Sequence, residues 1–486
     1  MSPTVLFSFV IAYFLLLLFV AWRTSRNSNN DSFFIGNRNS NWLLVSFGMI
    51  GTSLSGVTFV SVPGTVGSNH FAYFQVVIGY FIGYIIVAYV LLPLYYKLNL
   101  TSIYNYLLQR FGVVTYKTGA LFFILSRVLG ATARLYLVIN VLQIFILNNL
   151  HIPFALTTFI ILLMILLYTF EGGVKTIVFT DTLQTSFMLL GLITCIVYIM
   201  HTLGFSFFES LDALKEKSYT HIFNTDVNSA GFWMKQIIGG AFITIGMTGL
   251  DQEMMQKNIS VKTLKGAQKN MLTFSVVLML VNFLFLLLGG LLYLFAASNN
   301  IDIKGDDLFP TIALQHLPSF ISIVFIIALI SALFPSADGA LTALTSSFCI
   351  DILGLKRNEK TSEAQQKKTR LTVHISFAII FFLCVMIFEW MNNKSIIDVI
   401  LKVAGYTYGP LLGLFSFGIL TKRKIPQNAM AVAVCFAAPV FCYFLSMNAA
   451  KWFNGFSIGI ELLLINGMLT FAGLWLISKK EKTIAQ

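Results

Sequence analysis

The stretch FGMIGTSLSGVTFVSVPG, from Phe47 to Gly64, joins the apolar length of a membrane helix to residues that weaken helices. Four glycines and five serines or threonines lie among its apolar residues, and Pro63 stands near its end. Inside a bilayer, unpaired backbone carbonyls are tolerated only where they line a cavity or meet a ligand. The pattern therefore favours a helix that is unwound in its middle and faces a ligand. Ordinary helix packing through small residues is the alternative.

Apolar runs of similar length recur along the whole chain of 486 residues, of which 57% are hydrophobic and 11% charged. A soluble domain carries about 25% charged residues. Each run is long enough to cross the hydrocarbon core as a helix, and each is continuous, which favours helices over a β-barrel. We predict an all-α polytopic membrane protein with thirteen spans, at about 4–22, 42–64, 71–96, 117–148, 153–170, 177–201, 230–250, 270–297, 318–353, 371–392, 395–420, 427–448 and 456–478.

The loops between these runs differ in their content of lysine and arginine. The loops on one side hold 23 of the 32 basic residues, those on the other side hold 6, and three lie within spans. Basic loops remain in the cytoplasm. The distribution therefore predicts a multi-pass protein of the inner (plasma) membrane with its N-terminus outside and its C-terminus in the cytoplasm.

Several classes of function are disfavoured by composition. The net charge of +12 is spread between apolar runs and forms no single basic face for nucleic acid. The five cysteines show no CxxC or Cys/His spacing, so neither a zinc site nor a disulfide framework is expected. No GxxxxGK[ST] motif occurs, and no polar stretch is long enough for a catalytic domain. We therefore expect that the protein is not an enzyme and needs no obligate protein partner. We expect it to transport a small solute through the bilayer, driven by an ion gradient.

The ninth span, IALISALFPSADGALTALTSSFCIDIL (Ile327–Leu353), carries a carboxylate in its middle. Asp338 is costly at that depth unless it serves a site, although it could simply cap neighbouring groups. Pro335 frees a backbone carbonyl one turn earlier. Hydroxyl and carbonyl oxygens together suit a hard cation such as sodium. The seventh span has a glycine density like that of the second and is its plausible counterpart.

Two arginines share one face of the fourth span. Arg127 and Arg134 are seven residues apart, which is two helical turns. An arginine inside a bundle can hold a carboxylate in a bidentate fork, and we expect Arg134 to contact the solute. Arg127 could instead extend to the interface. Asp181 opens the sixth span and could lie in water near the cytoplasmic interface.

Four strings together resemble the sodium:solute symporter family. They are Tyr168–Val174 (YTFEGGV) followed by Thr180–Gln184 (TDTLQ), Gly249–Lys257 (GLDQEMMQK), the Ser/Thr-rich ninth span ending in Asp351-Ile352, and Gly405–Gly413 (GYTYGPLLG). The resemblance implies a LeuT-like fold with a five-plus-five inverted repeat. The chain would then be one transporter domain (1–486), with core spans at about 42–201 and 230–420 and peripheral spans at 4–22, 427–448 and 456–478.

The resemblance also implies a site for the coupling ion, Na⁺. Its ligands would be backbone carbonyls of the unwound second span, at Gly51 and Leu54, and carbonyl or hydroxyl groups of the ninth, at Ala332, Pro335 and Ser336. Pro335 departs from the family pattern, which has a hydroxyl at this position.

Sialic-acid symporters of the family are similar to this chain around the second span, and their positions imply further candidates. Their second sodium site maps to Asp181, Pro335, Asp338 and Gly339, where serines would be expected beside the aspartate at 181, and Asp338 could replace the lost hydroxyls. Solute contacts map to Ser53, Ser55, Thr58 and Gln75. The family's carboxylate-binding arginine aligns with Gly130, one turn from Arg134.

These observations predict a sodium-coupled symporter that imports a small polar organic solute, such as a sugar acid or another carboxylate, by alternating access. A proton-coupled symporter, with Asp181 or Asp338 as the titrating group, is the alternative within transport. A solute-sensing membrane receptor that does not transport is the alternative outside it.

Overall fold

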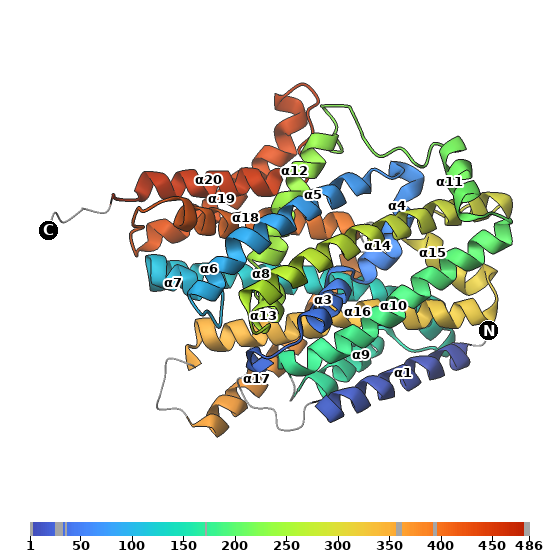
Figure 1. Cartoon of the computed structure of the whole chain (residues 1–486), viewed down its shortest axis with the longest axis horizontal. Coiled ribbons are helices and arrows are strands. Elements are labelled where there is room, and N and C mark those ends of the chain that lie inside the picture. Colours follow the sequence, from blue (N-terminus) through green and yellow to red (C-terminus); the bar gives the residue numbers. More distant parts are fainter. Residues whose placement is uncertain are drawn as a thin grey trace.

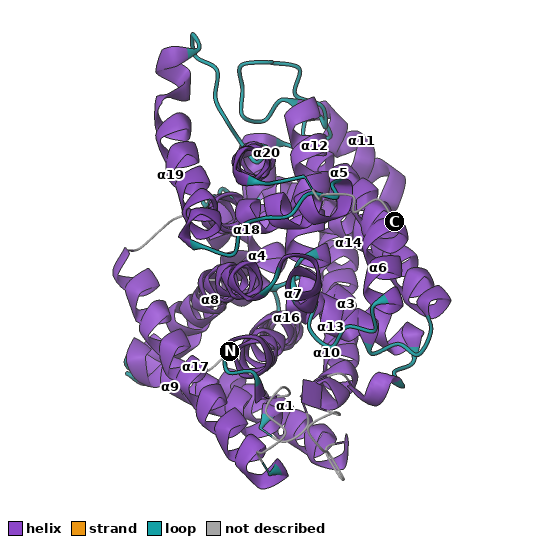
Figure 2. Cartoon of the chain, turned by 90° about the vertical axis from the view of Figure 1, so that its left-hand side faces the viewer, coloured by secondary structure: helices purple, strands orange, loops and turns teal. Residues whose placement is uncertain are grey.

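The chain folds as an assembly of helices. The computed structural model describes residues 3–24, 33–34, 36–170, 173–355, 362–391 and 396–480. Within these ranges the only β-type pairings are two isolated bridges, between Ser40 and Val261 and between Lys424 and Lys479. The predicted all-α class is confirmed, and Figure 2 shows helices joined by loops throughout.

The first half of the chain contains α1 (Pro3–Thr24), η1 (Gly36–Arg38), α3 (Trp42–Ser53), α4 (Gly56–Asn69), α5 (Tyr73–Ile86), η2 (Val87–Leu91), α6 (Leu92–Lys97), α7 (Asn105–Phe111), α8 (Val113–Leu142), η3 (Gln143–Leu147), η4 (Asn148–Leu150), α9 (Phe154–Thr169), α10 (Gly173–Leu203) and α11 (Phe207–Glu216). The second half contains α12 (Trp233–Thr244), η5 (Ile245–Gly249), α13 (Gln252–Ile259), α14 (Leu264–Ser298), η6 (Gly305–Asp307), α15 (Leu308–Thr311), η7 (Ile312–His316), α16 (Ser319–Ser347), η8 (Phe348–Ile352), α17 (Glu363–Met391), α18 (Ile396–Leu420), α19 (Ala429–Trp452) and α20 (Leu462–Ile477).

The long helices identify a multi-pass membrane protein. Among the described residues, nine helices are long and apolar enough to cross a bilayer, and the bent pair α3 and α4 makes a tenth candidate. Two shorter apolar helices, α9 and α20, accompany them. Each of the predicted apolar runs contains at least one helical segment. Most of the long helices run along the long axis of the molecule in Figure 1.

The second predicted span is broken in its middle. Helix α3 ends at Ser53, α4 begins at Gly56, and the two axes differ by 55°. Leu54 and Ser55 have ψ angles of 68° and 173°, outside the helical range. As a result, the carbonyls of residues 51–54 accept no hydrogen bond from the described part of the chain. The predicted unwinding is confirmed.

The seventh predicted span is also followed by a break, at its C-terminal end. Helix α12 passes into a π-helical turn, η5, and the chain leaves the helix at Leu250 before Asp251 caps α13. Glycine also serves close packing here, because a β-carbon at Gly240 would meet the Val76 carbonyl of α5 at 2.5 Å. Both interpretations of glycine-rich spans, packing and interruption, therefore apply to this segment.

Helix α16 lies in the interior of the bundle (Figures 1 and 2). All of its residues from Ala328 to Ser347 are buried. Pro335 lies inside the helix without ending it, and it leaves the carbonyl of Ser331 without its usual backbone donor. Asp338 follows within the next turn, so the helix brings a carboxylate to the centre of the molecule.

Candidate functional site

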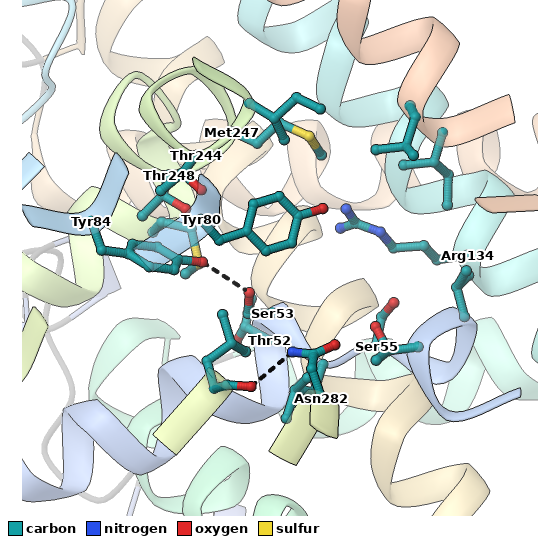
Figure 3. A pocket seen from close by; sticks show the side chains of 18 of the residues that line it. Thr52, Ser53, Ser55, Tyr80, Tyr84, Arg134, Thr244, Met247, Thr248 and Asn282 are labelled. Carbon is teal, nitrogen blue, oxygen red and sulfur yellow. Dashed lines mark hydrogen bonds between the residues drawn. The ribbon is translucent and has the colours of Figure 1, made fainter. Parts of the chain in front are cut away.

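A cavity of about 100 Å³, lined by both polar and apolar side chains, lies at the break between α3 and α4 (Figure 3). Its wall is formed by the unwound segment together with parts of α5, α8, α12, η5 and α14. The break explains the position of the cavity, because unpaired carbonyls need a polar neighbour or a ligand. The C-terminus of α3 and the N-terminus of α4 meet there, so the partial charges of both helix ends act on the cavity.

Four of the five predicted solute contacts line this cavity: Ser53, Ser55, Thr58 and Arg134. Gln75 is not among the lining residues. Its amide nitrogen donates to the carbonyls of Ala72 (2.9 Å) and Gly231 (3.4 Å), and its oxygen accepts from the Asn224 backbone (3.2 Å). The structure therefore places Gln75 as an anchor of the loop before α12, away from the cavity wall.

Arg134 has no hydrogen bond or ion pair with any described residue. In Figure 3 its guanidinium points toward the hydroxyl end of Tyr80, across the cavity. That hydroxyl lies 3.5 Å from the hydroxyl of Tyr73. Ser53 adds a further hydroxyl, 3.5 Å from that of Tyr84. An unpaired cation thus faces a space lined with groups that can donate or accept hydrogen bonds.

Arg127 lines the same cavity, but its charge is already balanced. One guanidinium nitrogen is paired with Glu253, and another lies 3.6 Å from Oδ2 of Asp251. The hydroxyl of Tyr408 donates to the same Asp251 oxygen at 2.6 Å. With a side chain that is 4% exposed, Arg127 pairs inside the bundle, and the expectation that it could extend to the interface is wrong.

Two of the predicted sodium ligands, Gly51 and Pro335, lie close together on α3 and α16. A β-carbon added at Gly51 would lie 3.5 Å from Cγ of Pro335 and would overlap the hydroxyl of Thr185 on α10. Ser336 is buried, and its hydroxyl donates to the Leu333 carbonyl at 2.9 Å, so its oxygen can still accept or coordinate. Leu54 lies at the break, and its carbonyl belongs to the unpaired set described above.

Ala332 is the remaining predicted sodium ligand and is buried in α16, one turn before Ser336. The described residues contain no cluster of three or more His, Cys, Asp or Glu side chains that could hold a metal ion. The oxygens available between α3 and α16 are backbone carbonyls and hydroxyls, which suit an alkali cation better than a transition metal.

Asp181 and Asp338 both lie in the interior. Asp181 is fully buried, so the expectation that it sits in water at the interface is wrong. The ammonium of Lys257 donates to its Oδ2 at 2.6 Å, and the hydroxyl of Thr52 lies 3.3 Å from the same atom. Asp338 accepts from the hydroxyl of Tyr168 at 2.6 Å.

Sequence reasoning missed the partners that organise this region: Lys257, Glu253, Asp251, Tyr168 and Tyr408. A signal for two of them was present, since Glu253 and Lys257 are four residues apart and share a helix face. Charged side chains at such a spacing are unusual in an apolar chain and indicate internal pairing. Their partners on α8 and α10 depend on helix packing, which the sequence alone does not disclose.

A comparison with protein families matches residues 33–435 to the model of the sodium:solute symporter family. Similar proteins include the sodium/sialic acid symporters of Aliivibrio fischeri (24% identity, 92% of this chain and 88% of that protein) and Proteus mirabilis (24%, 96% and 94%). The human sodium-coupled monocarboxylate transporter 2 is 25% identical over 83% of this chain and 65% of its own length. A solved Na⁺-coupled sialic acid symporter, in its substrate-bound outward-open state, superposes with a TM-score of 0.82 at 20% identity, covering 98% of this chain and 99% of that one.

Proposed function

Because the chain belongs to the sodium:solute symporter family, we propose that it imports a small monoanionic carboxylate together with sodium, with sugar acids as the first candidates. Two of its relatives are named for sialic acid and one for monocarboxylates. Those names describe the relatives. The residues of this chain supply an independent argument for the charge of the solute.

The unpaired guanidinium of Arg134 is the single observation that carries the proposal. An isolated charge away from bulk water is costly unless a counter-charge meets it. A carboxylate satisfies a guanidinium in a bidentate fork, and the hydroxyls of Ser53, Ser55 and Thr58 can bind the polar remainder of a solute. Arg127 is already paired, so among the described residues that line the cavity Arg134 supplies the one free positive charge, which suits one carboxylate.

We propose that the coupling ion binds in the space between the unwound segment and α16. The ligands would be the carbonyls of Gly51 and Leu54, and carbonyl or hydroxyl groups at Ala332, Pro335 and Ser336. Sodium at this position would stabilise the broken conformation of α3 and α4. The solute binds beside the same break, so each ligand would raise the affinity of the other by linkage.

Asp181 and Asp338 are the candidates for a second cation site. Lys257 already holds one oxygen of Asp181, so an exchangeable cation would sit on the Asp338 side. That cation is either sodium or a proton, and a proton would make the symporter proton-coupled. Uptake by proteoliposomes that carry a sodium gradient while the proton gradient is collapsed separates the two. Uptake that stops on collapse would favour the proton.

We further propose that α9, α20 and the pair α12 and η5 also cross the bilayer, which gives thirteen spans. The core would be a five-plus-five inverted repeat over about 42–201 and 230–420 within one domain, with its N-terminus outside and its C-terminus in the cytoplasm. The two interrupted segments, at Leu54 and at Leu250, support this arrangement, because paired broken helices mark the binding site of such transporters.

The decisive experiment measures ligand-induced thermal stabilisation of the purified protein. The probes are sialic acid, gluconate and lactate, with glucose as the neutral control, each in sodium chloride and in choline chloride of equal ionic strength. We expect a carboxylate to raise the melting temperature in sodium only, because ligands that bind the folded state stabilise it. Stabilisation by glucose and by no carboxylate would contradict the proposal.

The matched variant is Arg134→Gln, which keeps a polar side chain and removes the charge. We expect the apparent affinity for the carboxylate to fall about 10- to 100-fold, in keeping with the loss of a hydrogen-bonded charge pair worth roughly 1.5–3 kcal/mol. Sodium-driven uptake into proteoliposomes tests the same variant and also separates a transporter from a receptor. Binding without any flux in the unaltered protein would identify a receptor.

A further inference from the structure

The ammonium of Lys257 is surrounded by oxygen atoms in the manner of a bound cation. Lys257 belongs to α13, and its side chain is 3% exposed. It donates to Oδ2 of Asp181 at 2.6 Å and to the hydroxyl of Thr52, and Oε1 of Glu253 lies 3.7 Å away. An ammonium has three protons to donate, and here oxygens from three helices lie around it.

These oxygens are the kind that alkali cations prefer. Carboxylate and hydroxyl groups are hard ligands, and no nitrogen or sulfur atom is among the three contacts described. The second oxygen of Asp181, Oδ1, is buried and has no hydrogen-bond partner among the described residues. Oε1 of Glu253 likewise has no hydrogen-bond partner among the described residues, so a shell of oxygens suited to a small cation is present with two carboxylate oxygens free to coordinate it.

The shell adjoins the proposed sodium site. Thr52 is in the last turn of α3, and its own carbonyl belongs to the unpaired set at the break. Its neighbour Gly51 faces Thr185, which lies one turn after Asp181 on α10. An alkali ion that entered the shell would therefore meet the ammonium directly, and two like charges at such a distance repel each other.

We infer that Lys257 is a built-in cation, which fills a position beside the break that would otherwise bind an alkali ion. The inference rests on the proposed sodium coupling and limits its stoichiometry, because the Asp181 position takes no exchangeable sodium in this protein. Lys257 also ties α13 to α3 and α10 through its two hydrogen bonds. Removing its charge opens an additional sodium site formed by Asp181 and Thr52.

The test uses sodium alone as the ligand. Melting temperatures of the purified full-length protein are measured across a titration of sodium chloride against choline chloride at constant ionic strength. The variants are Lys257→Met, which removes the charge, and Lys257→Arg, which keeps it. We expect Lys257→Met to melt at a lower temperature than the unaltered protein in choline. Sodium should raise the melting temperature of this variant at least twice as much as it raises that of the unaltered protein, and the sodium titration should have a higher Hill coefficient. Lys257→Arg should keep the unaltered response.

A second variant guards against misfolding. In Lys257→Met combined with Asp181→Asn the acidic ligand is gone, so the additional sodium response should disappear. If Lys257→Met folds only in sodium, the inference is supported. If it folds in neither salt while the double variant folds in both, sodium does not replace the ammonium and the inference is wrong.

Failure of this inference is distinguishable from failure of the proposed function. A sodium response of Lys257→Met equal to that of the unaltered protein overturns the built-in cation and leaves sodium coupling in place. Absence of any sodium response in the unaltered protein overturns the coupling site at Gly51 and Ser336. A response that appears only in Lys257→Met would still support the built-in cation.

Discussion

The space around individual glycines determines how closely the helices can pack at the break. Gly51 lies where a β-carbon would overlap the Thr185 hydroxyl and approach Pro335. At Gly130, on α8, a β-carbon would meet nothing within 4 Å. The two glycines therefore have different roles, although both lie in helices that line the cavity.

We predict that Gly51→Ala forces α3 away from α10 and α16 and weakens sodium binding. Overpacking of this kind costs about 1–3 kcal/mol, so the sodium concentration for half-maximal stabilisation should rise several-fold. Gly130→Ala is the matched control and should be neutral or slightly stabilising, because alanine is favoured over glycine in helices by about 1 kcal/mol. Equal sodium titrations for the two variants would show that the approach of α3 to α16 does not matter for the ion.

Single residues also show where sequence reasoning reaches its limit. The resemblance to sialic-acid symporters predicted Ser53, Ser55 and Thr58, and all three lie on the cavity wall. Arg134 was predicted because a charge in an apolar run is conspicuous, and it lines the same cavity. Gln75 could not be placed, because its three hydrogen-bond partners lie in a loop and in backbone that the sequence does not position.

At the scale of elements, the short helix α13 connects several of the helices around the cavity. All eight of its residues are buried. Glu253 pairs with Arg127 of α8, Lys257 with Asp181 of α10, and Asp251, which caps the helix, with Tyr408 of α18. Both carboxylates that balance Arg127 come from this one segment, so a movement of α13 would release Arg127 in a single step.

Interrupted helices follow from the sequence more reliably than their partners do. The second span was recognisable because glycine and hydroxyl residues coincide, and the break falls within the quoted string, at Leu54 and Ser55. The end of the seventh span was less clear, because its glycines also pack closely on α5. The bonds of α13 to several other helices depend on tertiary contacts, which no local pattern encodes.

The Arg127–Glu253 pair allows a prediction for this element. Removing one partner of a buried ion pair leaves an uncompensated charge and costs about 3–5 kcal/mol, whereas removing both costs far less. We expect Arg127→Gln and Glu253→Gln each to lower the melting temperature in detergent, and the double variant to recover most of the loss. Because Asp251 also approaches Arg127, Glu253→Gln should be the milder single variant. Additive losses in the double variant would contradict a direct pairing.

At the scale of the whole molecule, apolar length and composition were enough to predict an all-α, multi-pass membrane protein. Helices form throughout because only helices and closed barrels satisfy the backbone within a bilayer. The number of crossings is less determined, since α9 and α20 have only 16 residues each, below the usual 20 of a spanning helix. Their membrane position depends on the neighbouring helices and on tilt.

Orientation in the membrane gives the last prediction. The basic residues of the loops divide 23 to 6, which predicts that the loop after α10 is outside and the loop after α13 inside. Glu216 and Lys262 are exposed side chains in these two regions, and the described native cysteines are buried or partly buried. In intact cells, a membrane-impermeant maleimide should label Glu216→Cys and leave Lys262→Cys unlabelled, while permeabilised cells should show both labelled. The unaltered protein measures the background from its own cysteines. The reverse pattern would invert the topology, and with it the direction in which the sodium gradient drives the solute.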